Sequence, residues 1–329
     1  MRRVLLAPIV WLMTALLASS LAPALAQTPA QTYPARLIKM IVPAPPGGQT
    51  DVLARFLAQR LQAALGQTVM IDNRGGATGI QGGRAAAAAE PDGYTIFFGN
   101  TSTLTILPAI SRNAGYDPAK NFAAVASVSE SYMILCVHPD FPAKTLGEFI
   151  AYAKANPGKL NFGNAGAGNV TQLTGEMLRH AAGIDFVGVP HKGGAESVTG
   201  VLGRQVDFVL ESPVILLPLI REGKLRALAV TSAQRKSELP DIPTMREGGA
   251  DFVATLLTGV VVPAGTPAPV VAKLNAAIND GLRSSEMKEA LAKFGSEPRI
   301  GAPQEFEAFM KSETKKWSDT AKAAGVQLD

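Results

Sequence analysis

The sequence contains only one cysteine, Cys136, and three histidines among its 329 residues. A single cysteine allows no intrachain disulfide bond, so we expect the fold to depend on its hydrophobic core. The histidines His138, His180 and His191 are scattered along the chain and have no cysteine partner, which argues against a zinc site. We therefore expect neither a metal ion nor a cofactor.

Motifs of several enzyme classes are also missing. Neither G-x-S-x-G nor a Walker G-K-[ST] occurs, and no dense block of lysine and arginine suggests a nucleic-acid partner. GAGNVT at 166–171 matches the dinucleotide motif G-x-G-x-x-G only in part. A Rossmann site also needs an acidic residue about 20 residues further on, at the end of the next strand. That strand ends here in Pro190 and His191, so a nucleotide site is not expected.

Residues 1–26 have the organisation of a signal peptide. Arg2 and Arg3 precede an apolar run from Val4 to about Ala18, which is short for a membrane span, and Ala24-Leu25-Ala26 fits the small-x-small cleavage rule. We predict cleavage near Ala26 and export of a soluble chain, with an uncleaved membrane anchor as the alternative. Removing two arginines and no acidic residue lowers the formal net charge from +4 to +2.

The rest of the chain is organised around IVPAPPGGQTD at 41–51. A strand over 37–42 leads into Gly47 and Gly48, and the helical apolar pattern of 52–65 follows, with Gly66 as its C′ residue. Thr50 and Asp51 are predicted to cap the helix. Free amides and the positive end of the helix dipole favour a small anion there, although a tight turn without a ligand is the alternative.

Two more strands, at 68–74 and 94–100, alternate with helical segments, and this rhythm predicts a parallel sheet. Ligands of such sheets lie beyond the carboxyl ends of the strands. The segments expected to meet there are 47–51, 74–79 and 100–102.

The second half repeats this design. A strand at 160–162 leads into a loop with Gly163, Gly166 and Gly168, and a helix from Val170 ends at Gly183. Further strands are expected over 122–139 (a strand pair or one crossing strand), 186–189, 206–211, 225–232 and 259–263, with helices over 146–156, 267–284 and from 303 on. The chain thus has one candidate anion site in each half.

Several blocks in this order resemble the Bug family, the periplasmic solute receptors of tripartite tricarboxylate transporters. The resemblance covers essentially the whole chain after residue 26. It is carried by PPGGQTD at 45–51, IDNRGGATG at 71–79, EPDGYTIFFGN at 90–100, NFGNAGAGNVTQLTGEM at 161–177, VPHKGG at 189–194, GRQVDFV at 203–209, GKLRALAVTSAQR at 223–235, LPDIPTM at 239–245 and VVVPAGTPAPVVAKLNAAI at 260–278.

The resemblance implies an α/β, two-lobed periplasmic solute-binding fold of the Venus flytrap type. Lobe one would comprise 27–127 plus 231–329 and lobe two 128–230, with two crossings between lobes near Val128 and Val230. The ligand would be a small carboxylate held by backbone amides and small polar side chains. By position, the contacts implied are Gly47, Gly48, Thr50, Asp51, Asn100, Thr101, Gly166, Gly168, Asn169, Val170, Thr171, Lys192, Gly193 and Glu211.

The chain departs from the family pattern at Ala44, Asn169, Gln172 and 256–258, where the family commonly has other side chains. These changes leave the identity of the carboxylate open. The implied function is ligand capture for a membrane permease by a monomeric periplasmic receptor that performs no chemistry. The alternatives are a periplasmic enzyme acting on small carboxylates, for which no catalytic constellation is visible, and a sensing receptor without transport.

Overall fold

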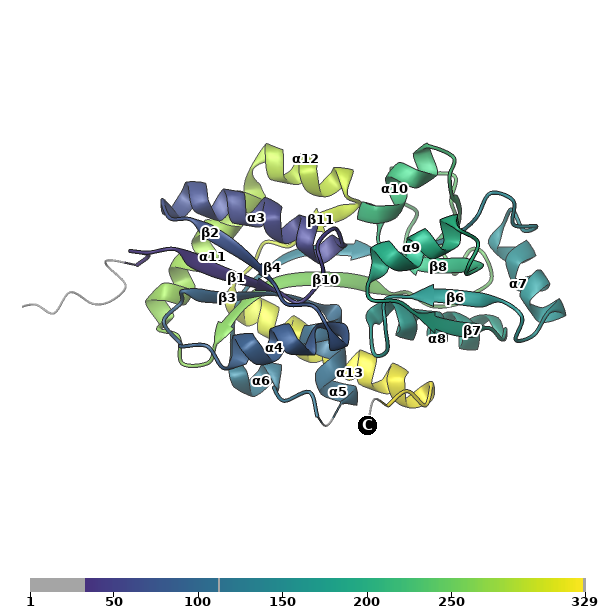
Figure 1. Cartoon of the computed structure of the whole chain (residues 1–329). Coiled ribbons are helices and arrows are strands. Elements are labelled where there is room, and N and C mark those ends of the chain that lie inside the picture. Colours follow the sequence, from purple (N-terminus) through teal and green to yellow (C-terminus); the bar gives the residue numbers. More distant parts are fainter. Residues whose placement is uncertain (1–32, 112, 328–329) are drawn as a thin grey trace, which may run out of the picture. The chain divides into compact units, whose positions relative to one another are not determined.

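The computed structural model describes residues 33–111 and 113–327, so the predicted signal peptide lies outside the described residues. Figure 1 shows two β-sheets, each flanked by helices. The first sheet has the strand order β11-β4-β10-β3-β1-β2. Its strands are β1 (Ile38–Val42), β2 (Val69–Asn73), β3 (Thr95–Asn100), β4 (Phe122–Tyr132), β10 (Thr255–Pro263) and β11 (Ser296–Pro298).

The parallel pairing predicted for the first three strands is confirmed, because β1 pairs in parallel with both β2 and β3. β10 runs antiparallel to β3 and β4, and β11 antiparallel to β4, so the complete sheet is mixed. The helices α3, α11 and α12 lie on one side of it and α4 and α13 on the other (Figure 1). Their bounds are α3 (Gln49–Leu65), α4 (Ile80–Ala87), α11 (Ala268–Arg283), α12 (Ser285–Lys293) and α13 (Pro303–Ala323).

Short helical segments connect some of these strands. They are the 3₁₀ turn η1 (Ala77–Gly79), the π-helical turn η2 (Ser102–Ile106), α5 (Leu107–Ile110) and α6 (Pro118–Asn121). η2 directly follows β3, so it lies at the carboxyl end of a central strand.

The second sheet has the order β7-β6-β8-β5-β9. Its strands are β5 (Ile134–Val137), β6 (Asn161–Asn164), β7 (Val187–Pro190), β8 (Phe208–Glu211) and β9 (Arg226–Val230). Successive side chains of a strand face opposite sides, and β8 follows this rule. Phe208 and Leu210 pack in the cluster with Leu173 of α8, whereas Val209 packs in the cluster with Val201 of α9. The helices around this sheet are α7 (Leu146–Ala155), α8 (Val170–Ala182), α9 (Gly194–Leu202) and α10 (Pro213–Arg221).

The segment 122–139 forms two strands that belong to different sheets. β4 remains in the first sheet as far as Tyr132 and β5 begins at Ile134 in the second, so the chain changes sheets at Met133. It returns through 231–254, where Met245 N–H donates to the carbonyl oxygen of Val230. The chain thus leaves the first sheet after Tyr132, leaves the second sheet after Val230 and rejoins the first at Thr255.

One capping prediction is wrong and one is confirmed in α3. The N-cap is Gly48 and the helix begins at Gln49, so Thr50 and Asp51 lie inside the first turn and no side chain caps the helix. Gly66 ends the helix in a left-handed conformation with φ of 68°, as predicted, and its N–H donates to Gln62 O. Glycine adopts such a φ without the steric cost that a Cβ imposes.

Candidate functional site

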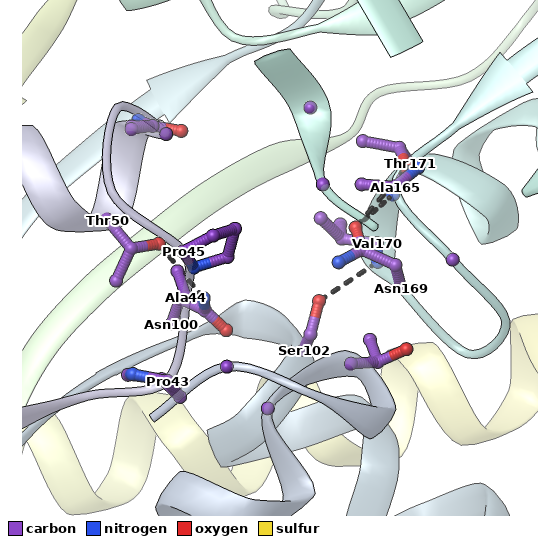
Figure 2. Close-up of a pocket in the computed structure, with 18 of the residues that line it drawn as sticks. Pro43, Ala44, Pro45, Thr50, Asn100, Ser102, Ala165, Asn169, Val170 and Thr171 are labelled. Carbon is purple, nitrogen blue, oxygen red and sulfur yellow. Dashed lines mark hydrogen bonds between the residues drawn. The ribbon is translucent and has the colours of Figure 1, made fainter. Parts of the chain in front are cut away.

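A cavity of about 1110 Å³ is lined by loops that follow strands of both sheets. One side of its wall comes from residues within 43–50, 73–80, 100–113 and 256–258, and the other from residues within 165–171 and 191–196 together with Glu211 and Ile215. Figure 2 shows these two sides facing each other, with Thr50 and Asn100 on one side and Asn169 and Thr171 on the other. A cavity of this volume suits a small organic ligand.

On the first side, the first turn of α3 presents free backbone donors. Among the described residues, the N–H groups of Gly48, Gln49 and Thr50 have no hydrogen-bond acceptor. The Asn100 side chain fixes this turn from the end of β3, since its Nδ2 donates to Thr50 Oγ1 at 3.0 Å (Figure 2). Unpaired amides at the positive end of a 17-residue helix favour negatively charged groups at this position.

Asp51 orders this turn from behind the cavity wall. Its carboxylate is 3% exposed and accepts hydrogen bonds from Gly47 N–H, Asn73 Nδ2 and Arg55 Nε at 2.9–3.1 Å. Burial opposes ionisation, but the bonds from Arg55, Gly47 and Asn73 outweigh it and hold the pKa of Asp51 below its ordinary value. Asp51 therefore holds the glycine turn in place and does not line the cavity.

On the second side, the glycine loop 163–168 uses its amides internally. Ala165 N–H donates to Thr171 Oγ1, Gly166 N–H to Asn164 Oδ1 and Gly168 N–H to Gln172 Oε1. Asn169 Oδ1 accepts the Thr171 N–H, and Ser102 Oγ from the first side accepts the Val170 N–H. The loop is therefore held by hydrogen bonds to its own and adjacent side chains. It contributes polar side chains such as Asn169 and Thr171 to the wall but few free N–H groups.

The free amides of the second side lie instead at the start of α9. Within the described part of the chain, Gly193, Gly194 and Ala195 have no acceptor for their N–H groups. Lys192 N–H donates to Glu196 Oε2, which closes the turn that leads into the helix. The sequence interpretation placed Lys192, Gly193 and Gly194 at the rim of the site but missed Ala195. The available signal was the pair Gly193-Gly194 ahead of a helical apolar pattern.

Glu211 ends β8 beside this helix start. The side chain is 7% exposed, its Oε2 accepts the Ser212 N–H at 2.7 Å, and a Cβ placed on Gly194 would lie 2.4 Å from its Oε1. No lysine, arginine or histidine in the described residues forms an ion pair with it. Burial raises the pKa of Glu211, against the opposing effect of the Ser212 hydrogen bond.

Direct hydrogen bonds join the two sides at the edge of the cavity. Thr78 Oγ1 donates to Ala167 O at 2.7 Å, and Val170 N–H donates to Ser102 Oγ at 3.0 Å (Figure 2). Thr78 is one of two non-glycine residues in the described ranges with a positive φ, here 56°. Such a backbone is unfavourable for a β-branched residue, and it places the hydroxyl where it reaches the opposite loop.

Most of the residues expected at the site line this cavity. Those in the wall are Gly48, Thr50, Asn100, Thr101, Gly166, Asn169, Val170, Thr171, Lys192, Gly193 and Glu211. Those outside the wall are Gly47, Asp51 and Gly168. The Gly168 N–H donates to Gln172 Oε1 at 2.7 Å, and its φ of 71° is one that glycine adopts readily.

Ser102 and Thr258 are wall residues that sequence reasoning did not assign as contacts. Thr258 Oγ1 lies 2.8 Å from Ser129 Oγ, so the cross-strand partner in β4 fixes its hydroxyl. The described residues contain no group of three or more histidine, cysteine, aspartate or glutamate side chains arranged to hold a metal ion. None of the helices that the structure describes is both long enough and apolar enough to cross a membrane.

The chain is similar to known proteins of one family. The family described as "Tripartite tricarboxylate transporter family receptor" matches residues 53–326. Protein BugT of Bordetella pertussis is 36% identical over 305 residues, which covers 91% of this chain and 92% of that protein.

Three solved structures are similar along nearly their whole length. The periplasmic binding protein BugD has a TM-score of 0.86 at 36% identity, with 90% of this chain and 100% of that chain covered. MatC from Rhodopseudomonas palustris, with bound malate, has a TM-score of 0.83 at 33% identity, with 88% and 99% covered. An R. palustris protein solved with adipate has a TM-score of 0.87 at 31% identity, with 90% and 99% covered.

Proposed function

Because the chain belongs to the family of tripartite tricarboxylate transporter receptors and has its two-lobed α/β fold, we propose that it captures a small carboxylate in the cavity between its two sheets. The observation that carries this proposal is the pair of helix starts in the wall. α3 and α9 both direct free N–H groups to the cavity, one from each side. Two such groups of donors favour negatively charged oxygen atoms.

The charges of the wall support an anion bound by backbone donors. Lys192 is the only lysine or arginine side chain that lines the described cavity. Charge-assisted hydrogen bonds to backbone amides contribute roughly 1.5–3 kcal/mol each, so a few of them in a closed cleft suffice for affinity of about 1 μM. The malate and adipate of the similar R. palustris structures are carboxylates of suitable size for such a site.

Ligand capture in this fold is proposed to involve a hinge at the two crossings. Met133 N–H donates to Thr231 Oγ1, and Thr231 N–H donates to Met133 O, both at 2.9 Å, so the crossing segments are bonded to each other. The proposed lobes are those expected from the sequence, 27–127 plus 231–329 for lobe one and 128–230 for lobe two. Closure then forms the contacts of both sides at once.

The proposed setting is the periplasm, reached after cleavage near Ala26, and the proposed partner is the membrane permease of the transporter. We propose that the receptor acts as a monomer and performs no chemistry. These statements rest on the family to which the chain belongs.

A thermal-shift screen of ligand-free protein tests the proposal. The protein is unfolded and refolded to remove any carried ligand, then mixed with malate, adipate, aspartate, benzoate, glucose, a nucleotide and Mg²⁺. A ligand at a hundredfold excess over Kd adds about 2.7 kcal/mol to the free energy of unfolding, which raises Tm by several degrees for this size of domain. A carboxylate should give this shift. A shift with only the sugar or the metal would overturn the proposal.

A further inference from the structure

Glu211 is an acidic side chain in a wall otherwise suited to anions. It is buried, lies against Gly194 at the start of α9, and forms no ion pair with a described residue. The other titratable side chains in the described wall are His191, Lys192 and Glu196. Glu196 is already bonded to Lys192 N–H, and His191 Nδ1 is 3.0 Å from the carbonyl oxygen of Val189. None of them provides Glu211 with a counter-charge.

An ionised Glu211 would repel the ligand that the rest of the wall favours. The free N–H groups of Gly193, Gly194 and Ala195 require an acceptor, and a bound carboxylate would place negative oxygen atoms close to Glu211 Oε1. Two carboxylates sharing one site cannot both remain ionised at low cost, and one of them takes up a proton. The Oε2 atom already accepts from Ser212 N–H, which leaves Oε1, the oxygen beside Gly194 at the start of α9, to carry that proton.

We infer that Glu211 is a neutral carboxylic acid in the loaded receptor, that its Oε1–H donates to a second carboxylate group of the ligand, and that the ligand class is therefore a dicarboxylate. This inference rests on the proposed function, and it assigns to Glu211 the recognition of the second carboxylate group of the ligand. The first carboxylate is bound at the start of α3, and the second lies between Glu211 and the start of α9. The proton comes from solvent when the ligand binds.

The inference predicts proton uptake on binding. Isothermal titration calorimetry with adipate, in two buffers of different ionisation enthalpy at pH 7–8, should give uptake of up to one proton per bound ligand. The Kd should rise by up to tenfold per pH unit above the pKa of Glu211. In Glu211→Gln, whose amide donates without titrating, both the proton uptake and this pH dependence should disappear.

Glu313→Gln is the matched control. Glu313 is a second buried glutamate, but it is bonded to Lys316 and Trp317 and lies outside the cavity wall. Its substitution should leave the proton uptake unchanged. A readout without ligand is the ¹³Cδ shift of Glu211 in glutamate-labelled protein, assigned by its absence from Glu211→Gln, which should titrate above the ordinary glutamate range of about 4.3.

The outcomes separate this inference from the proposed function. If monocarboxylates bind and adipate does not, or if adipate binds without proton uptake, Glu211 does not act as an acid and the proposed function still stands. Tight binding of aspartate that is lost in Glu211→Gln would show an ionised Glu211 paired with a ligand ammonium group and would overturn the inference. If no carboxylate shifts Tm or releases heat, the proposed function fails and the inference fails with it.

Discussion

Asp51 Oδ2 accepts the N–H of Gly47 at 3.0 Å, so an aspartate inside the first turn of α3 bonds back to the glycine turn that precedes the helix. The same carboxylate also accepts from Asn73 and Arg55. This arrangement fixes the backbone whose next three N–H groups face the cavity. The sequence interpretation assigned Asp51 to the N-cap of α3, whereas Asp51 lies in the first turn and Gly48 is the N-cap.

Replacing Asp51 by alanine should lower both stability and affinity. Hydrogen bonds to a buried charged group contribute about 1.5–3 kcal/mol, and the variant leaves Asn73 without this acceptor. We expect a loss of about 2–3 kcal/mol in the free energy of unfolding by urea denaturation. Arg55→Ala is the control. Its side chain is half exposed, so it should cost less than about 1 kcal/mol. Equal losses in the two variants would contradict this role.

The contribution of Asp51 to stability should depend on pH, because the folded protein lowers the pKa of its carboxyl group. Asp51 binds a proton more weakly in the folded than in the unfolded chain, so its stabilising effect is complete above its ordinary pKa of 3.8 and is lost as the pH falls through the lower folded value. The stability difference between wild type and Asp51→Asn should therefore shrink in acid below pH 3.8. A difference that stays constant between pH 7 and pH 3 would contradict the lowered pKa.

Ser102 provides the clearest test of the contacts between the two sides. It is 2% exposed and its Oγ accepts the Val170 N–H at 3.0 Å. In Ser102→Ala a buried N–H loses its acceptor when the sides meet, at a cost of about 1–3 kcal/mol. We expect the affinity for a carboxylate ligand to fall about tenfold or more in calorimetry. Ser312→Ala, an exposed hydroxyl on α13, should not change it.

The sequence predicted the strands and helices well because their patterns are local. The apolar period of α3, the glycine that ends it and the parallel pairing of β1 with β2 and β3 all follow from neighbouring residues. It could not predict which amides remain free, because that depends on partners far along the chain. Val170 N–H, for example, is taken by Ser102, which is 68 residues earlier.

The two glycine-rich segments of the second side also show that the sequence alone does not reveal which amides remain free. The loop with Gly166 and Gly168 was predicted as the anion site of this half, but Asn164 and Gln172 accept those two N–H groups. Gly194 begins a helix with free donors, and its role becomes apparent only from the position of Glu211 on β8.

Gly194→Ala should weaken ligand binding at the start of α9. The added Cβ would lie 2.4–2.5 Å from Glu211 Oε1 and Cδ, so the carboxyl group must move. We expect at least a tenfold loss of ligand affinity. Gly147→Ala is the control, because a Cβ there meets nothing within 4 Å and α7 should gain about 0.5–1 kcal/mol from the better helix former. Unchanged affinity in Gly194→Ala would show that Glu211 does not contact the ligand.

Glu211 should also make the stability of the ligand-free protein depend on pH in a way opposite to Asp51. Burial raises the pKa of Glu211, so the folded chain binds this proton more tightly than the unfolded chain. Stability is then lost as the pH rises from the ordinary glutamate pKa to the raised pKa of the folded chain, and the full cost of burying the charge persists above it.

Glu211→Gln removes this cost, since an amide has no charge to bury. The variant should match the wild type near pH 4 and have the higher Tm at pH 8 in differential scanning calorimetry. Glu313→Gln, which removes a buried carboxylate with partners, should instead lower Tm at pH 8. A lower Tm for Glu211→Gln at pH 8 would mean that the ionised form of Glu211 is stabilised by its surroundings.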